Sequence, residues 1–103
     1  MDIKISENGK QAVLFLKGHL DTYTAKEADA VFRKVSESHD EVTLDMSGVN
    51  YLSSAGIRVL RNLYMAIYKK GGIFRIANAG ETVLSVLEMT GLLDLLNLRA
   101  VNN

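Results

Sequence analysis

The chain has 103 residues and a formal net charge of zero, because 12 lysines and arginines balance 12 aspartates and glutamates. One domain of this length can bury a core of its own, and no apolar run in it approaches the roughly 18 residues that would span a bilayer. The balanced charge argues against direct binding to nucleic acid, and the absence of cysteine with only two histidines argues against disulfides and a metal site. We expect no cofactor.

The N-terminal segment predicts a β-hairpin at one edge of a sheet. Residues 2–6 alternate polar with apolar side chains, as a half-exposed strand does, and Asn8-Gly9 supplies a two-residue turn. Residues 12–16 are continuously apolar, which is typical of a central strand covered on both faces. The same N-terminus lacks the basic, apolar and cleavage segments of a secretory signal, so we expect a cytoplasmic protein.

A helix followed by a third strand comes next. Residues 24–36 predict the helix, because Thr24 and Glu27 have the spacing of a capping box and apolar residues then recur with helical periodicity. Residues 42–46 alternate as a strand and lead to the serine pair Ser53-Ser54. The apolar stripe of the helix consists of Ala28, Val31, Phe32 and Val35.

A second helix should begin near Ser54 and end before Gly71-Gly72. Its predicted buried stripe is Ile57, Leu60, Leu63, Tyr64 and Ile67. Its predicted exposed side carries Arg58, Arg61, Asn62 and Met65. Methionine beside arginine is typical of adaptable protein interfaces, although a single exposed methionine is also common by chance.

The last predicted elements are a strand over residues 73–77 and a third helix that ends near Gly91. Asn78 lies three residues before Glu81 and is the expected cap of that helix. The tail, residues 92–98, suggests a short helical turn and then an extended piece. The buried residues of the third helix are expected to be Val83, Val86 and Leu87.

The order of these elements predicts a single α/β domain. It has a mixed sheet of about four to five strands, an N-terminal hairpin, right-handed crossovers and three to four helices. Functional groups of such sheets gather at the carboxyl ends of the parallel strands. Three predicted loops meet this condition, at residues 18–24, 45–54 and 78–80.

Ser54 is the main candidate functional residue, and three roles are considered for it. Serine before an amphipathic run is a preferred N-cap, and most such serines do nothing else. The same position suits phosphorylation, because a phosphate there meets free backbone N–H groups and the positive end of the helix dipole. A nucleophile elbow is a poor match, because the pattern needs glycine where Leu52 stands. A base would have to be His19 or His39, and His39 is expected at a solvated helix end.

Two aspartates, Asp21 and Asp45, are a candidate carboxylate pair for metal or acid–base chemistry. The alternative is that each carboxylate accepts hydrogen bonds from the turn that follows it. This second interpretation is favoured, because both residues stand at the predicted end of a strand.

Three motifs in order resemble one known family. Residues 45–57 read DMSGVNYLSSAGI, and this stretch resembles the signature of the STAS domain, the fold of anti-sigma factor antagonists. Residues 18–21, GHLD, resemble the family's G-x-[LI]-D turn after the second strand. Residues 88–92, EMTGL, resemble the end of its third helix. The resemblance covers the whole chain as one STAS domain.

The resemblance implies a switch without enzymatic activity. In this family the unphosphorylated antagonist binds an anti-sigma factor that is also a serine kinase, the kinase phosphorylates the serine that opens the helix, and a metal-dependent phosphatase resets it. That serine matches Ser54. Relatives commonly have aspartate at the position of Ser53, which makes Ser53 a second candidate acceptor. The implied partner-binding face comprises Gly18, His19, Asp21, Ser53, Arg58, Arg61 and Met65.

Two other functions stay open. STAS domains also occur as modules that are not phosphorylated, so the chain could be an accessory subunit of a lipid-transport ABC complex, in which Ser54 only caps a helix. A serine esterase is the more remote alternative. Direct contact with nucleic acid or membrane is expected in none of them.

Overall fold

The structure, a computed structural model, describes residues 1–92. Within this part of the chain, four strands and three helices form in the predicted order. They are β1 (Asp2–Asn8), β2 (Gln11–Leu20), α1 (Ala25–Ser38), β3 (Glu41–Leu52), α2 (Ser54–Lys69), β4 (Ile73–Ala77) and α3 (Glu81–Met89). The helical turn and extended piece predicted for residues 92–98 lie outside the described residues, except for Leu92.

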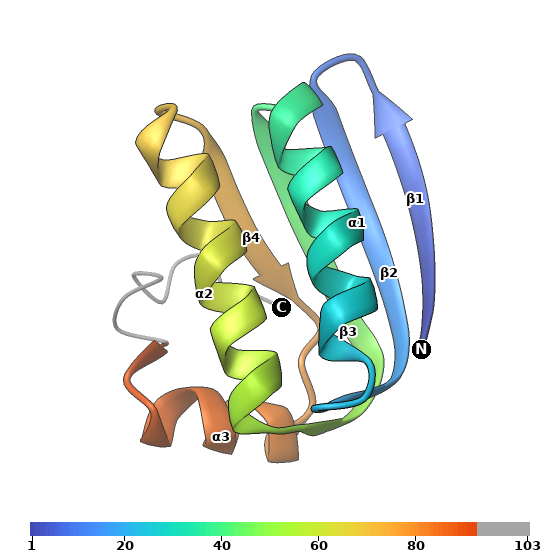
Figure 1. The fold of residues 1–103 in the computed structure, drawn as a ribbon, viewed down its shortest axis with the longest axis vertical. Helices are drawn as coiled ribbons and strands as arrows, with labels where there is room; N and C mark the ends of the chain where they lie inside the picture. Colours follow the sequence, from blue (N-terminus) through green and yellow to red (C-terminus); the bar gives the residue numbers. More distant parts are fainter. Residues whose placement is uncertain (93–103) are drawn as a thin grey trace.

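The strands form one mixed sheet in the spatial order β1-β2-β3-β4 (Figure 1). β1 runs antiparallel to β2, whereas β2, β3 and β4 run parallel to one another. The hairpin turn lies one position later than predicted: Asn8 pairs with Gln11, and Gly9 and Lys10 connect the strands. Gly9 has φ of +63°, which glycine tolerates without strain. The α/β class and the edge position of β1 are confirmed.

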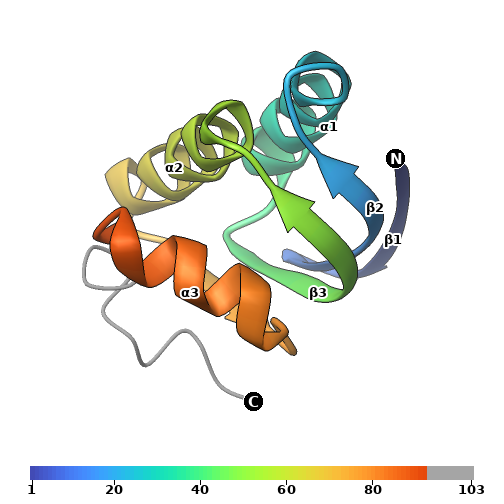
Figure 2. The ribbon, with the colours of Figure 1, turned by 90° about the horizontal axis from the view of Figure 1, so that it is seen from below.

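The helices α1 and α2 lie side by side on one face of the sheet, and α3 lies across its lower end (Figures 1 and 2). A row of fully buried side chains, Leu14, Leu44 and Ile76, crosses the sheet beneath the helices. Phe15 points to the opposite face and is 45% exposed, because successive strand side chains alternate between faces. The prediction that β2 is covered on both faces is therefore wrong for the described residues.

The two long helices bury the stripes that their periodicity predicts. Ala28, Phe32 and Val35 of α1 are buried, and Val31 packs partly against the core. In α2 every predicted core residue is buried except Tyr64, which is half-buried. α1 continues past the predicted end to Ser38. The hydrophobic stripes therefore set which face of each helix meets the sheet.

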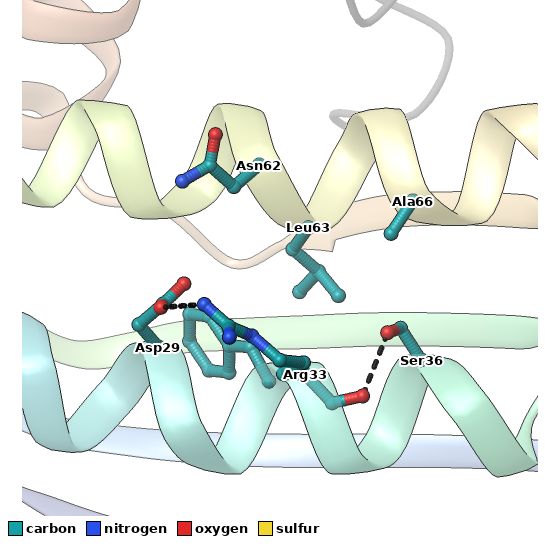
Figure 3. A pocket seen from close by; sticks show the side chains of 7 residues that line it. Asp29, Arg33, Ser36, Asn62, Leu63 and Ala66 are labelled. Atoms are coloured by element: carbon teal, nitrogen blue, oxygen red, sulfur yellow. Dashed lines mark hydrogen bonds and ion pairs between the residues drawn. The ribbon is translucent and has the colours of Figure 1, made fainter.

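A pocket of about 130 Å³ lies between α1 and α2 (Figure 3). The Arg33 guanidinium donates to the Asp29 carboxylate at 2.6 Å, and the Ser36 hydroxyl donates to the Arg33 carbonyl at 2.8 Å. These polar groups already have hydrogen-bond partners within α1, so we interpret the pocket as a packing gap between the helices and not as a ligand site. Its lining residues are Asp29, Phe32, Arg33, Ser36, Asn62, Leu63 and Ala66.

His39, which we expected in solvent, is buried at the end of α1 with 5% of its surface exposed. Its Nε2 lies 2.7 Å from a Glu7 carboxylate oxygen, and its Nδ1 lies 3.0 Å from the Val35 carbonyl. The prediction fails because Glu7 reaches the histidine from β1, a contact that depends on strand pairing. His39 thus ties the hairpin to α1 at the end of the sheet remote from Ser54.

Two predicted capping hydrogen bonds are also absent from the structure. Thr24 is the N-cap residue of α1, as predicted, but its hydroxyl makes no capping bond and donates to the His19 carbonyl at 2.8 Å. Asn78 has φ of +59° and donates its side-chain amide to Asp45, and Gly80 is the N-cap residue of α3. In both places a side chain of capping type bonds to a neighbouring strand or turn instead of the helix.

Candidate functional site

The carboxyl ends of β2 and β3 meet the N-terminal ends of α1 and α2 at one end of the molecule, seen from below in Figure 2. The Ser53 amide donates to the Leu20 carbonyl at 3.0 Å, which joins the two strand ends directly. As predicted for this class of sheet, polar residues of two connections come together here.

Most of the predicted loop at residues 45–54 belongs to β3, which was not foreseen. Phe15 pairs with Asp45 and Lys17 with Gly48, so β3 contains one extra residue between these pairs. A second shift separates Gly18 from His19. Bulges of this kind let a strand stay paired while its side chains change direction. The polar residues of the motif therefore lie along a bulged strand that carries the chain to Ser53.

Gly56 fixes the start of α2 against the strands. A Cβ atom at this position would lie 2.5 Å from the Leu20 carbonyl oxygen and 2.9 Å from Leu52 Cδ1. Only a residue without a side chain permits this approach. The position of the serine pair is thereby set by contact between a helix backbone and the end of β2.

The two serines have different roles, and the predicted assignment of the cap is wrong. Ser53 is the N-cap residue, with extended backbone, and its hydroxyl accepts a hydrogen bond from the Gly56 amide at 3.3 Å. The Ser53 carbonyl accepts from the Ile57 amide at 2.9 Å. Ser54 is the first residue of the helix and is exposed. Its hydroxyl is thus available to another molecule, whereas that of Ser53 holds the helix.

Asp21 organises the connection between β2 and α1, as predicted. Its Oδ1 accepts from the amides of Tyr23 at 2.9 Å and Thr24 at 3.2 Å, and its own amide donates to the Thr24 hydroxyl at 3.0 Å. This turn projects Tyr23 into solvent, where it is 93% exposed. One oxygen of the carboxylate is therefore engaged by the backbone of the turn, as the second interpretation predicts.

Asp45 is likewise held by its neighbours. Burial by itself would raise its pKa, but the amide and hydroxyl of Ser47 and the side-chain amide of Asn78 donate to the carboxylate and together lower that pKa. A lowered pKa keeps the group ionised at neutral pH. The hypothesis of an Asp21–Asp45 catalytic pair therefore loses its support, because each carboxylate serves its own turn.

The described contacts of the His19 side chain are with Asn50 and Tyr51 rather than with the serine pair. Its Nδ1 lies 2.5 Å from the Asn50 side-chain oxygen, and its ring meets that of Tyr51 edge-on at 5.8 Å between centroids. Leu20 and Leu52 are buried beneath the helices, so the preceding residues His19 and Tyr51 face the other side of the sheet. This orientation weakens the esterase hypothesis, since a serine nucleophile needs a base within hydrogen-bond reach.

The outer side of α2 carries the remaining predicted residues. Arg58, Arg61 and Met65 are exposed, Met65 by 37%. The first turn of α2 contains no acidic residue, whereas Glu27 and Glu81 lie in the first turns of α1 and α3. The beginning of α2 is therefore the more electropositive helix terminus.

The structure brings Asp21, Ser53 and Ser54 together at one end, and places Gly18 and His19 among the last residues of strand β2 beside it. Arg61 and Met65 lie farther along α2, away from that end. Sequence reasoning did not single out two exposed aromatic residues there, Tyr23 and Tyr51, which are 93% and 50% exposed. The signal that could have found Tyr23 is an aromatic side chain inside a predicted polar loop.

Two negative observations apply to residues 1–92. Histidine, aspartate and glutamate side chains nowhere form a group of three that could hold a metal ion in this range. Over the same residues, each helix is too short or too polar to cross a bilayer.

The fold and this site define a small α/β domain with a serine-bearing helix start at the carboxyl edge of its sheet. The family model of the STAS domain matches residues 2–102, so the chain belongs to the STAS domain family.

Among known proteins, the chain is similar to the anti-sigma-B factor antagonist of Bacillus subtilis (strain 168), with 25% identity over 97% of this chain and 90% of that protein. It is also similar to the structure of the Bacillus cell fate determinant SpoIIAA in the phosphorylated form, with a TM-score of 0.78 and 13% identity over 98% and 89% of the two chains. A sulfate transporter family protein from Wolinella succinogenes has a TM-score of 0.79 and 17% identity over 89% and 75%.

Proposed function

We propose that the protein is an anti-sigma factor antagonist that binds a serine-kinase anti-sigma factor when unphosphorylated and is switched off by phosphorylation of Ser54. The observation that supports this proposal most is that only one serine of the pair makes the capping hydrogen bond. Ser53 carries the capping bond to Gly56, and Ser54 stands exposed beside it. A modification of Ser54 would therefore leave the structural hydrogen bond intact.

The chemistry at Ser54 is a phosphoryl transfer. The Ser54 oxygen loses its proton and bonds the γ-phosphorus of ATP, the bond from that phosphorus to the bridging oxygen breaks, and ADP leaves. The product adds about −1.5 to −2 charges at a helix start that has no acidic residue of its own. Backbone N–H groups of the first turn and the helix dipole favour a phosphate there. A metal-dependent phosphatase would remove it.

Ser53 fits the proposal although relatives of this type commonly have aspartate there. Serine and aspartate are both preferred N-cap residues, because each offers a short oxygen acceptor to the N–H groups of the first turn. The Ser53 hydroxyl makes this bond here. The substitution preserves the helix start and removes one negative charge from the partner face. Ser53 itself becomes the less suitable phosphate acceptor, because it is half-buried and its oxygen is engaged.

The proposed partner face begins at Ser54 and Asp21 and extends in two directions. It follows the outer side of α2 through Arg58, Arg61 and Met65, and it reaches the end of β2 at Gly18 and at His19, whose ring points to the other face of the sheet. We include Tyr23 in this face because its side chain is exposed beside Asp21, and because tyrosine and arginine contribute most strongly to protein interfaces.

A second function has one observation in its favour. The likeness to a sulfate transporter family protein agrees with a role as a STAS module of a transport system, including the accessory subunit of a lipid-transport ABC complex. In that role Ser54 would not be modified, and replacing it would leave binding to the transport partner unchanged.

The test is a titration against the anti-sigma factor serine kinase of the same cells. Ser54→Ala should bind like wild type, and Ser54→Asp should bind at least about tenfold more weakly, a loss of roughly 1.4 kcal/mol. Ser6→Asp is the matched control, because Ser6 is exposed on β1 and pairs with Val13 near the hairpin turn, whereas Ser54 follows the other end of the sheet. Equal affinity of Ser54→Asp and Ser54→Ala would contradict switching by charge at this residue.

A further inference from the structure

The outer side of α2 forms one continuous stripe that begins at Ser54. Arg58, Arg61 and Met65 follow at helical spacings of four, three and four residues, and all are exposed. Residues spaced in this way lie above one another on a single helix face. The serine and Arg58 are therefore direct surface neighbours, with about 5–6 Å between Cβ atoms at such a spacing.

Arg58 has no acidic partner within residues 1–92. Two other arginines of this part of the chain are paired: Arg33 with Asp29 and Arg75 with Glu41, each at 2.6 Å. Arg58 makes no such bond to a described residue, and the first turn of α2 contains no acid. Its guanidinium is thus available to an anion that appears at position 54.

We propose that Arg58 receives the phosphate of a modified Ser54, so that phosphorylation withdraws a positive charge from the partner face as well as adding negative charge to it. This inference rests on the proposed function and specifies how that site is regulated. An anion at position i with a cation at i+4 is the favourable orientation on a helix. Guanidinium also matches phosphate oxygens with two parallel hydrogen bonds.

The consequence concerns the partner. Within residues 1–92 of the unmodified protein, neither Arg58 nor Arg61 forms an ion pair, and two such cations suit an acidic patch on the anti-sigma factor. After modification Arg58 is held by the phosphate, and the same patch meets a pair whose net charge is about −0.5 to −1. Arg61 lies two turns from Ser54, about 10 Å along the helix axis, where salt largely screens its interaction with the phosphate.

The test uses the full chain with phosphoserine incorporated at position 54 during translation, so that no kinase is needed. Phosphorus NMR then follows the second ionisation of the phosphate with pH, near pH 6. Arg58→Gln should raise the midpoint by about 0.3 pH units relative to the native arginine. Arg61→Gln is the matched control and should leave it unchanged. Arg58→Lys, which keeps the charge, should retain most of the native shift.

The inference would be overturned if the phosphate ionised at the same midpoint pH in the protein with native Arg58 and in the Arg58→Gln variant. An equal shift in the Arg61→Gln variant would overturn it too. These outcomes are separate from those of the proposed function. If phosphoserine weakens partner binding while the midpoints coincide, the switch stands and the role of Arg58 falls. If the midpoints differ while phosphoserine leaves partner binding unchanged, the pairing stands and the proposed switch falls.

Discussion

Replacing the two serines of the pair separately should destabilise the protein at Ser53 and leave its stability nearly unchanged at Ser54. Ser53→Ala removes the acceptor that meets the Gly56 amide at 3.3 Å, and Gly56 is buried, so that amide loses its partner away from water. Loss of a serine N-cap costs about 1 kcal/mol, which for a domain of this size lowers the melting temperature by roughly 4–8 °C. Ser54→Ala changes an exposed residue without a capping bond and should alter stability by less than about 0.5 kcal/mol.

Urea unfolding followed by circular dichroism measures both effects, with Ser53→Asp as the control that keeps a capping oxygen. Ser53→Asp should unfold close to wild type. If Ser54→Ala lost more stability than Ser53→Ala, the assignment of cap and exposed hydroxyl would be wrong, and so would the reason for choosing Ser54 as the switch.

Three further results are expected. Gly56→Ala should lower the free energy of unfolding by about 1–3 kcal/mol despite its better helix propensity, because its Cβ would meet the Leu20 carbonyl. In urea unfolding, Gly80→Ala should cost less, below about 1 kcal/mol: its Cβ has open space, and only the preference for glycine over alanine at an N-cap is lost. A stabilised Gly56→Ala would refute the close contact. Tyr23→Ala should weaken binding to the kinase about tenfold or more with little change in melting temperature, and unchanged affinity would remove Tyr23 from the partner face. The pKa of Asp45 is lowered, so its ionised form stabilises the fold above the unfolded pKa of about 3.9, and this contribution is lost as the pH falls through the folded pKa. Asp45→Asn should therefore lose less stability than wild type on acidification to about pH 2. Parallel acid-unfolding curves would contradict this.

Hydrophobic periodicity was sufficient to predict the elements and their order. The stripe of α2 alone determines which side of that helix faces the sheet, and Ile57, Leu60 and Leu63 are buried as expected. Glycine marked two of the boundaries correctly, at Gly9 and Gly71, which both have positive φ. These features depend on local sequence, which is why one sequence suffices to find them.

Side-chain hydrogen bonds were harder to predict. Thr24, Asn78 and Ser54 all occupy positions that favour a cap, yet none of the three makes the capping bond. Their alternatives come from the tertiary structure: Thr24 bonds the end of β2, and Asn78 bonds Asp45 of the neighbouring strand. A short polar side chain chooses among acceptors that only the folded chain brings near it.

Long-range pairing explains the other two differences. β3 continues through residues 47–52 because β2 stays paired with it across two bulges. The polar residues of this stretch are typical of a loop, so the sequence did not indicate a strand there. His39 is buried because Glu7 arrives from β1. In the candidate site, the motif located the serine pair, whereas the separate tasks of Ser53 and Ser54 became visible only from the hydrogen bond to Gly56.

The central claim is that Ser54 is the phosphorylated residue of a switch. Incubating the purified protein with ATP and the anti-sigma factor serine kinase of its own cells, followed by mapping of the phosphate by mass spectrometry, tests it most directly. We predict one phosphate on Ser54 in the wild type and none on the Ser54→Ala variant. Phosphate on Ser53, or equal phosphorylation of Ser54→Ala, would contradict the claim.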